Sequence, residues 1–144
     1  MSSTYYGNEK YLIDDKGRIA IPAQARRSAG KSTTFLLVPG FEGCIALYDE
    51  SQWARVEEKL QQLSGKRKDR AFKRALLMNA KRVAVDAQGR ITIPSTLLDR
   101  AGLGREAILF GQGTHIEIWN PERLQAVLGE VEGNFEQVAE EVLK

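Results

Sequence analysis

The hydrophobic pattern begins with two short β-like segments that flank a polar turn. Ile19 and Ile21 alternate with polar or small neighbours, and this period of two predicts a half-buried strand. A second apolar run occupies residues 11–13. Between them, residues 14–17 contain Asp and Gly, which favour a tight turn in which Gly17 has positive φ. The pattern therefore predicts a β-hairpin in this part of the chain.

Pro22 ends this strand pattern, because proline has no backbone N–H to donate to a ladder. Proline also suits the first position of a helix, so we expect a short helix over residues 22–29 that is closed by Gly30. Two further apolar runs, residues 35–38 and 44–48, flank a Pro-Gly pair and predict a second hairpin.

Two longer segments have the apolar period of amphipathic helices. Asp49 suits the N-cap of the first, and Gln52 completes a capping-box pattern. Asn120 and Pro121 suit the start of the second helix. The apolar stripes comprise Trp53, Val56, Leu60 and Leu63 in the first helix, and Leu124, Val127, Leu128 and Val131 in the second.

The acidic end of the chain follows the second helix. Gly129 and Gly133 weaken a continuous helix, so residues 130–144 are expected to form a separate or frayed segment. Apolar residues nevertheless recur there at helical spacing, namely Phe135, Val138 and Val142. This spacing favours an ordered C-terminal helix.

The predicted elements occur twice in the same order. Residues 13–22 read Ile-Asp-Asp-Lys-Gly-Arg-Ile-Ala-Ile-Pro, and residues 85–94 read Val-Asp-Ala-Gln-Gly-Arg-Ile-Thr-Ile-Pro. The same offset of 72 residues aligns residues 35–38 with residues 107–110. Two copies are too few for a solenoid, so we predict a paired, pseudo-symmetric domain.

Length and charge limit the classes of protein to which this chain can belong. A chain of 144 residues has the size of one domain, or of two small halves that share a core. No apolar run approaches the ~20 residues needed to cross a membrane, and we expect no secretory signal. Residues 1–82 contain 16 Lys or Arg and 9 Asp or Glu, whereas residues 83–144 contain 5 and 10. This segregation is compatible with a polyanionic partner for one face.

The strongest basic run lies between the two copies, at residues 66–74. On a helical wheel one side comprises Lys66, Arg70, Lys73 and Arg74, and the other Phe72, Ala75, Leu76 and Asn79. The pattern predicts an amphipathic helix rather than a flexible linker. Three roles are open for its basic side. It is solvated, it pairs with the acidic tail of the same or a neighbouring chain, or it contacts nucleic acid.

The repeated turn places an arginine beside an aspartate in each copy. A two-stranded β-ribbon fits the major groove of DNA, where arginine binds a guanine edge or a phosphate through two hydrogen bonds. Asp14 and Asp86 would accept hydrogen bonds from turn amides and brace Arg18 and Arg90. Alternatively, each Asp–Arg pair only holds its hairpin closed. Two copies favour the first interpretation, because two arginine-bearing ribbons bind more tightly than one.

These residues resemble those of the MraZ family of bacterial transcriptional regulators, which are built from two SpoVT/AbrB-like repeats. The resemblance covers nearly the whole chain and depends on the doubled Asp-x-x-x-Arg turn followed by Ile-x-Ile-Pro. Supporting segments are Tyr6-Gly7, residues 70–76, Ala101-Gly102-Leu103 and residues 116–119. The resemblance implies an α+β fold, a pseudo-symmetric double-repeat swapped-hairpin β-barrel with flanking helices.

The resemblance also implies an organisation and a set of site residues. It divides the chain into repeat 1 (8–54), a helical linker (55–82), repeat 2 (83–126) and a C-terminal acidic helix (127–144). It assigns DNA binding to five residues of the two turns, namely Asp14, Lys16, Arg18, Asp86 and Arg90. Gln88 stands where the first turn has Lys16, so the first turn is expected to be the better DNA reader.

The function that the resemblance implies is regulation of transcription. Such proteins bind repeated G-rich boxes in double-stranded promoter DNA ahead of the division and cell-wall gene cluster, which includes their own gene. They form ring-like homo-oligomers in the cytoplasm, on the nucleoid, without a cofactor, a small-molecule substrate or a membrane partner. AbrB-like folds also occur in antitoxins, so the alternative is a protein-binding module. A disordered tail would favour that alternative, whereas an ordered C-terminal helix argues against it.

The remaining chemical groups indicate neither an enzyme nor a metal site. No nucleophile–base constellation is recognisable. His115 is the only histidine, so it is expected to be structural or exposed, and a site with several histidines is excluded. The single cysteine, Cys44, is expected to be a half-buried strand thiol. Trp53 and Trp119 are expected to pack in the core.

Overall fold

Antiparallel pairing connects all the strands that the computed structural model describes, which covers residues 5–28 and 33–144. Six strands form a sheet in the order β1-β7-β8-β4-β3-β5, and two form a ribbon, β2-β6. The first half contributes β1 (Asn8–Leu12), β2 (Arg18–Ala20), β3 (Thr34–Pro39) and β4 (Ile45–Asp49). The second half contributes β5 (Lys81–Ala84), β6 (Arg90–Thr92), β7 (Glu106–Gly111) and β8 (Ile116–Trp119).

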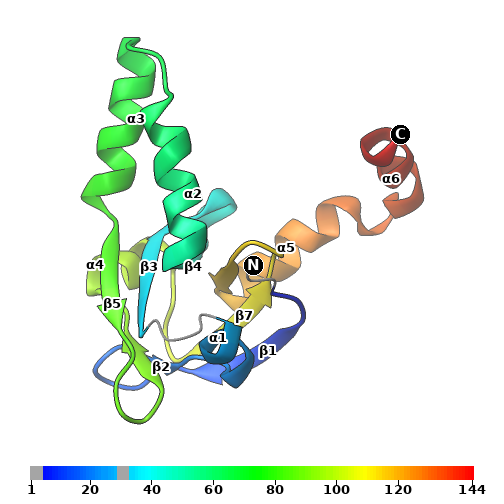
Figure 1. Ribbon diagram of the computed structural model, residues 1–144. Coiled ribbons are helices and arrows are strands. Elements are labelled where there is room, and N and C mark those ends of the chain that lie inside the picture. The colour runs from blue at the N-terminus through cyan, green and yellow to red at the C-terminus, as the bar shows by residue number, and fades with distance from the viewer. Residues whose placement is uncertain (1–4, 29–32) are drawn as a thin grey trace.

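Helices surround these strands, which makes the fold α+β. The first half contains α1 (Ala23–Ser28), the 3-10 turn η1 (Phe41–Gly43), α2 (Glu50–Gln61) and α3 (Arg67–Met78), and the second half contains α4 (Ser95–Arg100), α5 (Pro121–Glu132) and α6 (Phe135–Leu143). In Figure 1, α2 and α3 form a hairpin at one end of the sheet, and α5 leads to α6 away from the strands. None of the helices in the described ranges is long and apolar enough to span a membrane.

The pairing of the first two strands corrects the predicted local hairpin. The turn at residues 14–17 forms, but β1 and β2 do not form a ladder with each other. β1 pairs with β7, and β2 pairs with β6, with Ile19 opposite Ile91. Each strand therefore finds its partner in the other half of the chain. The local sequence cannot distinguish these pairings, because either one satisfies the alternating pattern.

The predicted hairpin of residues 35–38 and 44–48 forms, and the second half contains a matching one. β3 pairs with β4 with Leu37 opposite Leu47, and β7 pairs with β8 with Leu109 opposite Ile118. β4 also pairs with β8, which joins the two halves at the centre of the sheet. The short helix predicted after Pro22 is α1, and its predicted closure at Gly30 lies outside the described residues.

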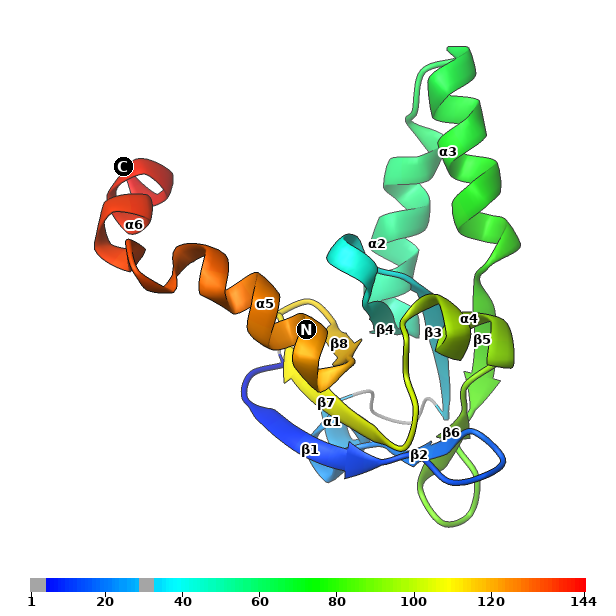
Figure 2. The same ribbon diagram turned by 180° about the vertical axis from the view of Figure 1, so that it is seen from behind.

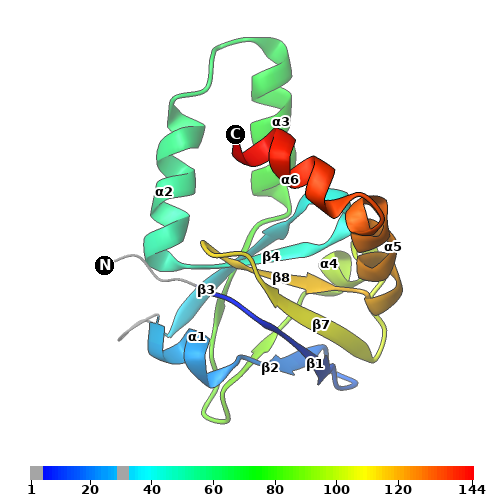
Figure 3. The same cartoon turned by 90° about the vertical axis from the view of Figure 1, so that its right-hand side faces the viewer.

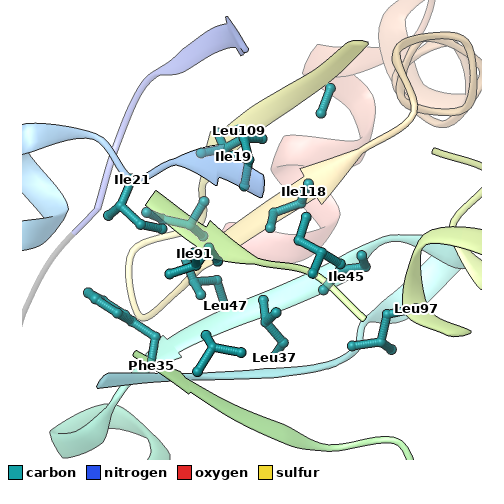
Figure 4. Packing of buried hydrophobic residues seen from close by; sticks show 14 of the residues in the cluster. Ile19, Ile21, Phe35, Leu37, Ile45, Leu47, Ile91, Leu97, Leu109 and Ile118 are labelled. Atoms are coloured by element: carbon teal, nitrogen blue, oxygen red, sulfur yellow. The ribbon is translucent and has the colours of Figure 1, made fainter. Parts of the chain in front are cut away.

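The core belongs to both halves. Figure 4 shows isoleucine and leucine side chains from β2, β3, β4, β6, β7 and β8 pointing toward one another. Ile19 and Ile91, which occupy matching positions of the two copies, are each 1% exposed. The pseudo-symmetric repeat is therefore a single packed unit, because neither half buries its apolar face alone.

The N-caps of α2 and α5 agree with the sequence pattern. Asp49 accepts a hydrogen bond from the backbone N–H of Gln52 at the start of α2. Asn120 accepts from Glu122 and Arg123 at the start of α5. α5 continues through Gly129 as far as Glu132, and α6 is a separate helix. Both tryptophans are buried, as expected: Trp53 of α2 packs in a cluster with residues of β3 and β4, and Trp119 of β8 packs with Leu124 of α5.

Candidate nucleic-acid interface

The first predicted DNA-reading turn is organised by its aspartate. Asp14 Oδ1 accepts hydrogen bonds from the backbone N–H groups of Lys16 and Arg18, both at 2.9 Å. Asp14 Oδ2 accepts from Nε of Arg18 at 2.7 Å. Gly17 has a φ of 79° and donates to the Asp14 carbonyl. One carboxylate therefore holds both the turn backbone and the adjacent guanidinium.

The second turn repeats this geometry. Asp86 Oδ1 accepts from the backbone N–H groups of Gln88 and Arg90 at 2.9 Å, and Oδ2 accepts from Arg90 Nε at 3.0 Å. Gly89 also has a φ of 79°. The loss of the lysine at position 88 does not alter the turn, because the bond at this position uses the backbone N–H and not the side chain.

The hydrogen bonds favour the charged form of both carboxylates. The backbone N–H of Arg18 has the largest effect in lowering the pKa of Asp14 from its ordinary value of 3.8. The backbone N–H of Arg90 has the same role for Asp86. Both turns therefore carry an ionised Asp–Arg pair at neutral pH.

The two turns meet on one outward face. β2 and β6 pair so that Arg18 lies opposite Thr92 and Arg90 lies opposite Ala20, on the side of the ribbon away from buried Ile19. Arg90 Nη1 lies 3.9 Å from Asp14 Oδ2, which links the two copies. The side chains of Arg18 and Arg90 remain 31% and 28% exposed. Neither guanidinium is sealed inside the chain.

The arginines have donors in addition to those that hold the turns. Each braces its own aspartate through Nε. In the part of the chain that the structure describes, no hydrogen bond is recorded for the terminal nitrogens of Arg18. A guanidinium has five N–H donors, so an acceptor outside the chain can be bound without breaking the turn. Bracing of the hairpin and binding of an external acceptor are therefore compatible.

A third arginine, which the motif did not predict, lies against the second turn. A Cβ atom built on Gly89 would lie 2.9 Å from Nη1 of Arg26, an exposed residue of α1. The corresponding position on Gly17 faces Leu98 instead, at 3.4 Å from Cδ1. Arg26 and Leu98 are matched by the 72-residue offset, so the two copies place different residue types beside the two turns. The turn that lacks a lysine thus has a neighbouring arginine.

The basic helix lies far from these turns. Figures 1, 2 and 3 all show the β1–β2 and β5–β6 turns at one end of the molecule and the α2–α3 hairpin at the other. No residue of α3 is buried. Its basic side chains and the two turns therefore face different regions of space within one chain.

His115 and Cys44, the other groups considered in the sequence, lie outside the two turns. His115 stacks on Tyr48 with ring centroids 4.8 Å apart. Cys44 is 4% exposed, so it is buried more deeply than the predicted half-buried thiol, and it immediately precedes β4. Within residues 5–28 and 33–144, no three His, Cys, Asp or Glu side chains gather into a potential metal site.

Comparison with known proteins gives consistent matches along the chain. The family model described as "MraZ protein, putative antitoxin-like" matches residues 5–75 and again residues 76–144. A protein of Heliobacterium modesticaldum named "Transcriptional regulator MraZ" is 36% identical over 140 residues, which cover 96% of each chain. Proteins of the same name from Pediococcus pentosaceus and Caldanaerobacter subterraneus are each 38% identical and cover 96% and 93% of both chains.

Proposed function

The chain belongs to the MraZ family, and we propose that it is a DNA-binding transcriptional regulator whose two Asp–Arg turns read the duplex. The observation that supports this role is the convergence of Arg18 and Arg90 on one exposed face of the β2–β6 ribbon. The major groove admits a β-ribbon, and arginine pairs with guanine O6 and N7 through two donors. Phosphates would be bound through the same donors.

The five residues predicted from the turns have distinct roles in this proposal. Arg18 and Arg90 contact the DNA, and Asp14 and Asp86 hold their guanidinium groups in position. Lys16 is exposed at the tip of the first turn and adds a phosphate contact. The second turn has Gln88 at this place, and Arg26 beside Gly89 would supply a cation there.

The family membership supports a more specific proposal. The DNA would be the repeated G-rich boxes of the promoter ahead of the division and cell-wall gene cluster, with the protein's own gene in that operon. A ring-like homo-oligomer would present several turns to successive boxes, which raises the affinity without a new contact. The protein would act in the cytoplasm, on the nucleoid, and without catalysis. The sheet and the β2–β6 ribbon would together form the barrel-like core of the two repeats, for which we retain the predicted boundaries 8–54 and 83–126.

The test is binding to the chain's own upstream DNA. We expect Arg18→Ala and Arg90→Ala to weaken binding by about 1–3 kcal/mol each if the guanidinium reads a base. Arg55→Ala is the matched control, because Arg55 is an exposed arginine of α2 at the other end of the molecule. Wild-type binding should fall steeply with salt, as expected for phosphate contacts. Equal binding by all four proteins would contradict the assigned role.

A protein-binding, antitoxin-like module is the second candidate, because the family description itself includes the words "antitoxin-like". An ordered α6 disfavours a tail that wraps a partner while disordered. Stoichiometric co-purification of a small protein, together with failure to bind upstream DNA, would favour this second function.

A further inference from the structure

The C-terminal helix α6 has an apolar stripe that is largely exposed within the described part of the chain. Phe135, Val138, Val142 and Leu143 recur at the spacing of one helix face. Phe135, Val142 and Leu143 are 68%, 72% and 84% exposed. Surface leucines and phenylalanines are ordinary when scattered, but a continuous stripe marks a contact surface.

The position of α6 explains why most of its apolar stripe is exposed to solvent. The Asn120 cap and buried Leu124 fix the first turns of α5 on the sheet. The rest of α5 leads outward, and Figures 1 and 2 show α6 separated from the strands and from the α2–α3 hairpin. Within residues 5–28 and 33–144, the apolar stripe of α6 is not packed into any of the core clusters.

A second apolar surface lies at the α2–α3 hairpin. A groove of about 430 Å³ runs between α2, α3 and the sheet, and we call it the α2–α3 groove. Trp53, Leu60 and Leu76 are among the side chains that line it. Phe41 and Phe72 also line it, although they are 80% and 53% exposed. Two phenylalanines that border one groove and remain open to solvent indicate that the groove is not filled by the chain itself.

The charges around the two surfaces are opposite. Residues 50–82, which contain α2 and α3, carry ten Lys or Arg and four Asp or Glu. Residues 121–144 carry six Glu, with Arg123 and Lys144 as the only basic residues. Two cations, Lys59 and Arg100, and one carboxylate, Glu117, line the groove. Glu136 and Glu141 flank the apolar stripe of α6 on its helical wheel. An acidic amphipathic helix is therefore complementary to this groove in both polarity and charge.

We propose that α6 of one copy docks by its apolar stripe in the α2–α3 groove of a second copy. The nine residues of α6 span about 13 Å, comparable to the roughly 18 Å length of the twelve-residue α2 and α3. The contact joins two different surfaces, so it is heterologous, and repetition closes it into a ring or extends it as a filament. This inference deepens the proposed homo-oligomer and rests on it. It also assigns the basic hairpin to assembly, apart from the DNA-reading turns.

Assembly of the full chain without DNA tests the contact directly. The wild type should form species larger than a dimer by light scattering. Phe135→Glu in the tail and Phe72→Glu in the groove should each raise the protein concentration needed for assembly at least about tenfold. Both side chains are more than half exposed, so the fold should be retained. Met78→Glu is the matched control, because Met78 is 82% exposed and lies outside the lining of the groove on the same helix.

Mixing the two deficient variants distinguishes this contact from a symmetric one. A Phe72→Glu chain retains its tail and a Phe135→Glu chain retains its groove, so a mixture should form one-to-one dimers and nothing larger. The proposal is overturned if the wild type is monomeric, if either variant assembles like wild type, if the mixture stays monomeric, or if Met78→Glu is as damaging as Phe72→Glu. Since no DNA is present, a failure of the DNA-binding role would leave these results unchanged.

Discussion

Arg90 Nη1 lies 3.9 Å from Asp14 Oδ2, although the two residues belong to different copies of the repeat. The same oxygen accepts a hydrogen bond from Nε of Arg18 at 2.7 Å. Among the described residues, Asp86 has a recorded ion pair with Arg90 only. Within the described residues, Asp14 therefore contacts the arginines of both turns, whereas Asp86 contacts only the arginine of its own turn.

This asymmetry predicts unequal effects of neutralising the two aspartates. Asp14→Asn retains an acceptor for the turn amides but loses the charge that both arginines face, so it should weaken DNA binding more than Asp86→Asn. Dissociation constants on one promoter fragment at fixed salt measure the difference. Asp15→Asn is the control, because it removes the same charge from a neighbour with no recorded side-chain hydrogen bond in the described ranges. A larger loss for Asp86→Asn would refute the cross-copy link.

The turn glycines should differ in their tolerance of alanine. Both have a φ of 79°, which costs a side-chain-bearing residue about 1–2 kcal/mol. A Cβ on Gly17 would also lie 3.0 Å from the backbone oxygen of Ile93, whereas one on Gly89 would meet the movable tip of Arg26. Gly17→Ala should therefore reduce the free energy of unfolding more than Gly89→Ala in urea titrations. Gly104→Ala, where nothing lies within 4 Å, should have little effect.

Arg26 should contribute to the second turn alone. We expect Arg26→Ala to weaken DNA binding, because it removes the cation beside Gly89. Adding Gln88→Lys to this variant should restore part of the affinity, since it gives the second turn the charge that Lys16 supplies to the first. Arg27→Ala removes an exposed neighbour on the same helix and serves as the comparison. If Gln88→Lys improves neither the variant nor the wild type, phosphate binding at this turn is wrongly assigned.

Acid should loosen both turns at a pH below the ordinary range of aspartate titration. The native pKa of Asp14 and of Asp86 is lowered from 3.8, mainly by the backbone N–H groups of Arg18 and Arg90. Their contribution to stability is present above the pKa of the unfolded chain and is lost as the pH falls through the lower native pKa. Carboxyl titration by NMR should give midpoints below 3.8 for both residues. The Asp14→Asn, Asp86→Asn double variant should lack this part of the pH dependence of unfolding.

Cys44 should be unreactive in the folded protein. Burial, followed by the nearby Glu117 carboxylate, raises the pKa of its thiol to about 12. Almost no thiolate is then available at pH 8, and the residue is 4% exposed. A chromogenic disulfide reagent should label Cys44 slowly in buffer and rapidly in denaturant. Rapid labelling in buffer without loss of structure would show that the site opens.

The local elements could be predicted from the sequence because they depend on neighbouring residues. Asp49 and Asn120 cap their helices through backbone groups two or three residues away. The two Asp-x-x-x-Arg turns close through bonds within five residues, so the repeat of the motif implied a repeat of the geometry. Even the outward position of Arg18 and Arg90 follows from the alternation with buried isoleucines.

The partners of those elements were decided by the tertiary structure. The alternating pattern of residues 18–21 fits any antiparallel neighbour, and only the shared core selects β6 as the partner of β2. The contact between Arg90 and Asp14 and the approach of Arg26 to Gly89 join residues that are far apart in sequence. Their positions depend on how two apolar faces pack together, which is a property of the whole chain and not of any local segment.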